Sequence, residues 1–196
     1  MILRPERLTA LASALIVAVV VFTQPLQASD CEILAMEPGS SIEAAKKSLG
    51  IPAKIHSFSV HEKAYLTDTG ERVMYEWHRE GSAIVVEADG RGEILQIVVN
   101  VSHGKQRVPY GVVVGMDDFA GVVRKIGREY LNAGAIECRN GETTVPIEVS
   151  CGPEGSTTLS LVFSVRGATH CGERPSIELA QRLVGSGLVR SARLGP

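Results

Sequence analysis

The stretch GSSIEAAKKSLG, residues 39–50, predicts a short helix. Ser41 is well placed to cap its N-terminus, and Gly50 ends it. The apolar residues spaced to lie on one helical face are Ile42, Ala45 and Leu49. The stretch GMDDFAGVVRKIG, residues 115–127, has the same layout, with Asp117 as the capping residue. Its apolar stripe is Phe119, Val123, Ile126 and Tyr130.

Strand patterns follow each of these two helices. After the first they cover 73–80, 83–88 and 93–101, and after the second 135–139, 143–150 and 157–166. The turn signals Asp89-Gly90 and Asn140-Gly141 fall between neighbouring strands. Strict alternation in 157–166 is typical of a strand with one packed face and one solvated face.

We therefore expect an α+β fold built from two tandem repeats, each a helix followed by an antiparallel meander, with the helices packed on one sheet face. The expected division is a signal peptide (1–28), a first repeat (29–104), a second repeat (105–171), and a C-terminal helix with a loose tail (172–196). The tail is expected to be loose from Gly185 onward. The first half carries about fifteen extra residues, 56–70, between its helix and its meander.

The first 28 residues have the pattern of a secretory signal peptide. Arg4 and Arg7 precede an uncharged run, residues 8–22, and Ala28 is the small residue expected before a cleavage site. An uncleaved anchor is the alternative, but this run is shorter than the about 20 residues that span a bilayer. We expect a periplasmic or secreted protein, cut after Ala28, with no stable membrane insertion afterwards.

The net charge of the chain argues against a nucleic-acid partner. The formal net charge is −2, and it becomes −3 once Arg4, Glu6 and Arg7 are removed. No basic stripe of the kind that binds nucleic acid is present.

The chain has four cysteines, Cys31, Cys138, Cys151 and Cys171. An even number in an exported chain predicts two disulfides. If Asn140-Gly141 is a tight turn, Cys151 lies about 26 Å along the next strand from the residue opposite Cys138, at about 3.3 Å per residue. Because that distance is too long for a bridge, strand geometry favours Cys138–Cys171 and Cys31–Cys151.

The helix pattern of residues 39–52 resembles the start of the repeat unit in a group of exported bacterial domains. This group includes the SmpA/OmlA-type assembly lipoproteins and the tandem-repeat beta-lactamase inhibitor proteins. Residues 115–127 are similar, but Gly121 stands where the group has an apolar residue. The resemblance implies a binding or assembly role, and it implies a disulfide within a repeat, here Cys138–Cys151. The lipoprotein branch fits poorly, because Cys31 follows Asp30 and there is no lipobox. Both pairing schemes stay open at this stage.

The sequence contains no catalytic motif and no cofactor motif. The spacing of His56, His61, His78 and His103 matches no metal-ligand pattern, so we interpret these residues as ordinary surface and strand histidines. His170 and Cys171 are adjacent and point in opposite directions on an extended chain, which disfavours a nucleophile–base pair. Asp117 and Asp118 fit a helix cap better than an acid–base pair.

The free face of the sheet is the expected binding surface. Alternation directs Val73, Tyr75 and Trp77 inward. The residues expected to point outward are Glu76, His78, Glu87, Gln96, Val98, Asn100, Ser160, Val162 and Ser164. The extra segment 56–70, with Phe58 and Tyr65, is a second candidate surface.

We therefore expect a non-enzymatic periplasmic module that binds a protein, as an inhibitor, an immunity protein or an envelope-assembly factor. The alternative is a small exported hydrolase that depends on His78, His103 or His170. A purely structural envelope protein is the third hypothesis.

Overall fold

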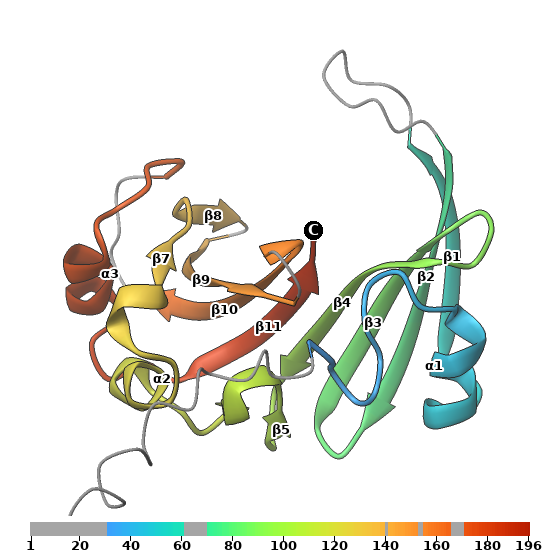
Figure 1. Cartoon of the computed structure of the whole chain (residues 1–196), viewed down its shortest axis with the longest axis horizontal. Helices are drawn as coiled ribbons and strands as arrows, with labels where there is room; N and C mark the ends of the chain where they lie inside the picture. The colour runs from blue at the N-terminus through green and yellow to red at the C-terminus, as the bar shows by residue number, and fades with distance from the viewer. Residues whose placement is uncertain (1–30, 61–69, 140, 153–154, 166–170) are drawn as a thin grey trace, which may run out of the picture.

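The computed structural model describes residues 31–60, 70–139, 141–152, 155–165 and 171–196. The predicted signal peptide, Tyr65, His61 and His170 lie outside these residues. Within the described ranges, three α-helices and one large antiparallel sheet form a mixed α+β fold (Figure 1). None of the helices in this described part has the length and apolar character needed to cross a membrane.

The helices are α1 (Ile42–Leu49), α2 (Phe119–Ile126) and α3 (Ile177–Val184). Each begins after a side chain that accepts a hydrogen bond from a backbone N–H of the first turn. These capping residues are Ser41, Asp118 and Ser176. All three helices were predicted, but the cap of α2 is Asp118 rather than Asp117. Asp117 instead accepts from the backbone N–H of Val113 and from Lys125 Nζ at 2.6 Å.

The sheet contains nine strands in the described part of the chain. The first four along the chain are β1 (Lys54–Val60), β2 (Gly70–Arg79), β3 (Ser82–Asp89) and β4 (Ile94–Val101). The others are β7 (Asn132–Ala133), β8 (Glu137–Arg139), β9 (Glu142–Cys151), β10 (Thr157–Val165) and β11 (Val189–Gly195). Their spatial order is β1-β2-β3-β4-β11-β10-β9-β7, and β8 also pairs with β9. A small second sheet joins β5 (Gln106–Arg107) to β6 (Val113–Val114) around the 3-10 turn η1 (Pro109–Gly111), and η2 (Arg128–Tyr130) follows α2.

The prediction of a loose tail is wrong. Strand β11 lies in the middle of the sheet, paired on one side with β4 and on the other with β10. Ala192 and Leu194 are completely buried. The strand is short, and its two partners are distant in sequence, so local pattern alone does not reveal it.

The prediction of an extra segment at 56–70 is also partly wrong. Residues 54–60 form β1, which pairs with β2 along its whole length at the edge of the sheet. Ile55 and Phe58 keep 57% and 39% of their surface exposed. Regular alternation is typical of a strand with one packed face, and the side chains of this partly covered edge strand do not follow it.

A continuous row of apolar side chains crosses the sheet on one face, which we call the core face. Directly paired residues of neighbouring strands lie on the same face. The row runs from β2 to β9 through Trp77, Ile84, Val99, Ala192, Leu161 and Ile147, all of them buried. Burial of this row against helices and loops is the main source of stability of the fold.

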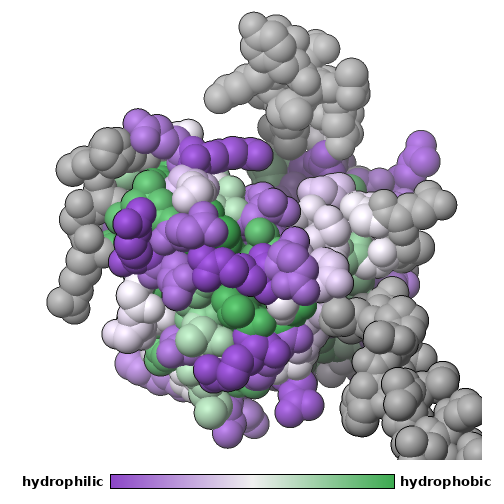
Figure 2. Space-filling model, turned by 60° about the vertical axis from the view of Figure 1, so that its left-hand side comes forward, coloured by the Kyte–Doolittle hydropathy of each residue, from purple (hydrophilic) through white to green (hydrophobic). Residues whose placement is uncertain are grey.

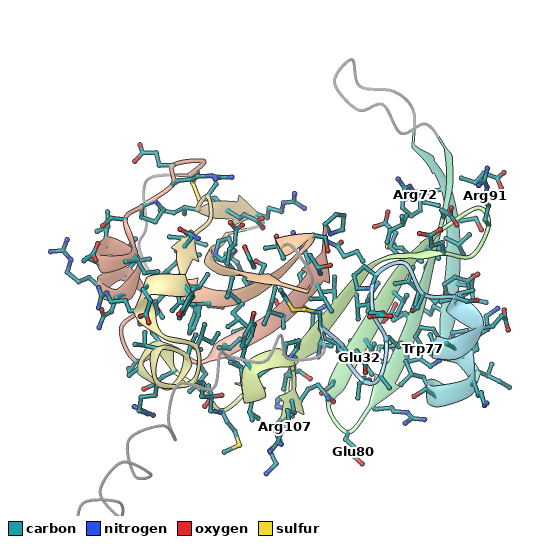
Figure 3. The ribbon with its side chains drawn as sticks, viewed as in Figure 1. Glu32, Arg72, Trp77, Glu80, Arg91 and Arg107 are labelled. Atoms are coloured by element: carbon teal, nitrogen blue, oxygen red, sulfur yellow. A yellow bond between two sulfur atoms is a disulfide. The ribbon has the colours of Figure 1, made fainter. Side chains whose placement is uncertain are left out.

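Two contacts attach helices to the core face. The Trp77 indole N–H donates to the carbonyl of Gly50, just after α1, at 2.9 Å. Figure 3 shows Trp77 beside α1. In the other half, the ring of Phe119 in α2 lies 6.1 Å from that of Phe163 in β10.

The structure decides between the two disulfide schemes. Cys31 is bonded to Cys151, with Cα atoms 5.8 Å apart, and Cys138 to Cys171, with Cα atoms 5.6 Å apart. The pairing implied by the family resemblance, Cys138–Cys151, is therefore wrong. Cys138 and Cys151 lie near opposite ends of neighbouring strands, as the geometric scheme required.

Candidate binding face

A second row of paired residues crosses the opposite side of the sheet, which we call the polar face. From edge to edge it contains Lys54, Glu76, Val85, Val98, Arg193, Ser160, Glu148 and Asn132. One residue comes from each of eight strands, so the row extends across the whole sheet. Its ends are charged or polar, and Val85 and Val98 are the apolar residues near its middle.

The structure places four of the five predicted binding residues on the polar face. Glu76 belongs to the central row. His78 lies two residues further along the same strand, on the same face, and is paired with Ala83. Glu87 pairs with Gln96 in the next row. Tyr65 lies outside the described residues. The fold thus brings Glu76, His78, Glu87 and Gln96 together, and their role in binding stays a prediction.

The predicted inward residues of β2 lie on the core face, but to different depths. Trp77 is 2% exposed, whereas Val73 and Tyr75 are half-buried. Tyr75 stacks on Trp77 with ring centroids 6.1 Å apart, and Lys46 Nζ lies 5.2 Å from the ring centre of Tyr75. The hydrogen bond that Lys46 Nζ donates to the Glu43 carboxylate raises the pKa of Lys46, so its side chain stays charged at neutral pH. These contacts make Trp77 a core anchor rather than a surface contact.

Charges in the N-terminal half of the polar face pair with one another. Glu76 Oε1 lies 2.8 Å from His78 Nε2, and its other carboxylate oxygen lies 3.4 Å from Lys54 Nζ. Glu87 lies 3.9 Å from Arg72 Nε. Arg72 is labelled in Figure 3 on β2, at the end of the sheet far from Glu80. This half of the face therefore carries charged groups that are already locally balanced.

The C-terminal half of the polar face differs. Within the described part of the chain, the side chains of Glu137, Glu148 and Arg193 form no ion pair and no hydrogen bond. They line a small recess of about 180 Å³ over β9, β10 and β11. These residues were not predicted as a site. The alternation of side chains in β9 could have placed Glu148 on the polar face. Arg193 could not be placed in this way, because it lies in the stretch that was expected to be a loose tail.

The histidines do not gather into a site among the residues that the structure describes. His56 lies on β1, paired with Met74, and His103 lies in the bend after β4. No group of three or more His, Cys, Asp or Glu side chains within the described ranges is arranged to hold a metal ion.

The surface beside α2 and α3 is mixed in character. Figure 2 brings this side forward and shows hydrophobic residues interspersed among hydrophilic ones. Tyr130 and Leu179 are exposed by 51% and 40%. Single exposed apolar residues of this kind are ordinary, so we do not assign a site to them.

A comparison of the chain with protein-family models, with curated proteins and with solved structures found no match.

Proposed function

We propose that the protein is a non-enzymatic binding module that holds a protein partner on its polar face. The observation that supports this most strongly is the row from Lys54 to Asn132, which offers one side chain from each of eight strands. Half-buried Val85 and Val98 near its centre supply apolar contact area, and the charged groups toward its ends supply specificity.

We further propose that the sheet is built from two units, α1 with β1–β4 and α2 with β7–β11, whose helices pack on the core face alone. The contacts of Trp77 with the end of α1, and of Phe163 with α2, support this arrangement. A sheet covered by helices on one side has its other side available to a partner.

We propose a periplasmic or secreted location. Two disulfides fit a chain that folds in an oxidising compartment, since cytosolic thiols are kept reduced. The pattern of residues 1–28 supports export as well. In that setting, an inhibitor, an immunity protein and an envelope-assembly factor are the kinds of role that fit.

The test is capture of a partner from envelope extract by the oxidised protein, with a matched pair of variants. Glu76→Ala with His78→Ala removes a carboxylate–imidazole contact of 2.8 Å from the polar face. Glu43→Ala with Lys46→Ala removes a contact of 2.7 Å from α1, on the core-face side of the sheet. We expect one stoichiometric partner whose affinity drops at least about tenfold for the first variant and not for the second. Equal retention by both variants would contradict the proposal.

One observation favours the hydrolase as a second candidate. The 2.8 Å contact of His78 Nε2 with Glu76 Oε1 resembles the arrangement by which a carboxylate orients a histidine base. If this function holds, a substrate panel gives turnover that His78→Ala abolishes.

A further inference from the structure

The recess on the C-terminal half of the polar face is lined by polar and charged side chains that have no partner among the described residues. It lies over three neighbouring strands, with Arg193 from β11, Ser160 from β10 and Glu148 from β9 in direct register. Glu137 stands at its rim, and Pro146 and Val162 supply apolar lining.

Ser160 is the first unusual feature. Its residue is only 9% exposed, and its side chain lines the recess. Its hydroxyl makes no hydrogen bond to any described residue. Buried hydroxyl groups in folded proteins normally have a partner, because an unsatisfied one lowers stability. A ligand in the recess would supply that partner.

Arg193 and Glu148 flank Ser160 with opposite charges that do not neutralise each other. The Cα atoms of Arg193 and Glu148 are two strand spacings apart, about 10 Å, and no ion pair joins their side chains. An anion beside Arg193 and a cation beside Glu148 would both be favourable, while a ligand of a single charge would be repelled by one end.

The Glu148 carboxylate lies close to the backbone at Gly134. A Cβ atom added there would lie 2.7 Å from Glu148 Oε1 and 2.7 Å from Pro146 Cγ. The Glu148 carboxylate thus lies close to the chain at Gly134, and no ion pair within the described residues neutralises it.

We propose that the recess binds an α-amino acid in its zwitterionic form. The carboxylate of the ligand accepts two hydrogen bonds from the Arg193 guanidinium, a geometry that Arg forms readily. Its ammonium group donates to Glu148, with Glu137 as a second acidic group nearby. The Ser160 hydroxyl lies between the two and hydrogen-bonds the ligand. A volume of about 180 Å³ admits a small amino acid. This site goes beyond the proposed protein-binding function and does not depend on it.

The test uses glycine and L-alanine as probes, titrated into the oxidised protein while backbone amide NMR signals are followed. N-acetylglycine, which lacks the ammonium group, and glycine amide, which lacks the carboxylate, are the controls at equal ionic strength. We expect saturable shifts of the signals of residues 147–149, 159–162 and 192–195 with both zwitterions. Each control should bind at least about tenfold more weakly, the loss expected for one charge-assisted contact.

Matched variants locate the site. Arg193→Gln and Glu148→Gln should each weaken glycine binding at least about tenfold. Arg190→Gln removes an exposed arginine of the same strand that does not line the recess, so it should change nothing. Ser160→Ala should weaken binding a few-fold, with the unfolding midpoint confirming that the variant is folded.

Three outcomes would overturn the proposal. The first is the absence of any saturable shift with glycine or L-alanine at tens of millimolar. The second is binding that Arg193→Gln and Glu148→Gln leave unchanged. The third is equal binding of the blocked compounds, which would indicate adventitious charge attraction rather than zwitterion recognition.

Discussion

Cys31 and Cys151, 120 residues apart in sequence, are joined by a disulfide that attaches the segment before α1 to the end of β9. Cys151 is only 1% exposed, and nearby Ile33 is completely buried. The bond therefore holds the segment before α1 against β9, in the half of the sheet that comes from the C-terminal part of the chain.

Loss of this bond should destabilise the protein more than loss of Cys138–Cys171, which closes 33 residues. The chain-entropy model gives a stabilisation of about 5 kcal/mol for the longer loop and about 4 kcal/mol for the shorter one. The paired variants Cys31→Ser/Cys151→Ser and Cys138→Ser/Cys171→Ser, unfolded in denaturant, measure both values. A larger loss for the second pair would show that the Cys31–Cys151 bond is not the main covalent constraint.

Trp77 is the only tryptophan, so its fluorescence reports on α1 and β2 without interference. Because it is 2% exposed, we expect blue-shifted emission and weak quenching by acrylamide in the folded state. Trp77→Phe removes the indole donor to Gly50 and should cost about 1 kcal/mol. Trp77→Ala should cost about 3–5 kcal/mol, because it leaves a cavity in the core. Emission typical of a solvated indole in the folded protein would contradict this packing.

Ala192→Asp tests whether β11 is a central strand. Ala192 is completely buried between Val99 and Leu161, so an aspartate there places an unpaired charge in the core. The expected cost is about 3–5 kcal/mol or complete unfolding. Ser191→Asp is the control, since its side chain points to the polar face, and it should cost under about 1 kcal/mol. Similar melting temperatures for both variants would support a loose tail instead.

Asp89 should contribute to acid sensitivity. Hydrogen bonds from backbone N–H groups, first that of Glu93 and then that of Arg91, lower the pKa of its carboxyl. A lowered folded pKa means that the ionised group stabilises the fold above its ordinary pKa of about 3.9, and that this contribution is lost as pH falls through the lowered value. The difference in unfolding free energy between the protein and Asp89→Asn should therefore shrink as pH falls below about 4. A difference that stays constant to pH 2 would rule out this role for Asp89.

Local pattern was sufficient for much of the fold. The cap and apolar stripe of α1, the existence of α2 and α3, and the alternation of β2, β3, β4, β9 and β10 are properties of short stretches. The details of α2 were wrong: its cap is Asp118, and its buried residues are Phe119, Gly121, Val122 and Ile126, so Val123 and Tyr130 of the predicted stripe are not among them. The edge strand β1 and the inserted strand β11 depend on tertiary context instead. Residues 189–195 become a strand only because β4 and β10, from different halves of the chain, pair with them on both sides.

The candidate face was also predictable only where local pattern was sufficient. Glu76, His78, Glu87 and Gln96 share a side of the sheet because antiparallel register follows from short turns. The row formed by Arg193, Ser160 and Glu148 requires the register of β11 with β10, which no turn sets, because α3 lies between these two strands.

Site-specific photo-crosslinking tests the central claim most directly. A photoreactive residue is introduced in place of Asn100, which is exposed on the polar face, and separately in place of Ala44, which is exposed on α1. After irradiation in envelope extract, we predict one dominant crosslinked protein from position 100 and none from position 44. Crosslinks of equal yield from both positions, or from position 44 alone, would contradict a binding role for the polar face.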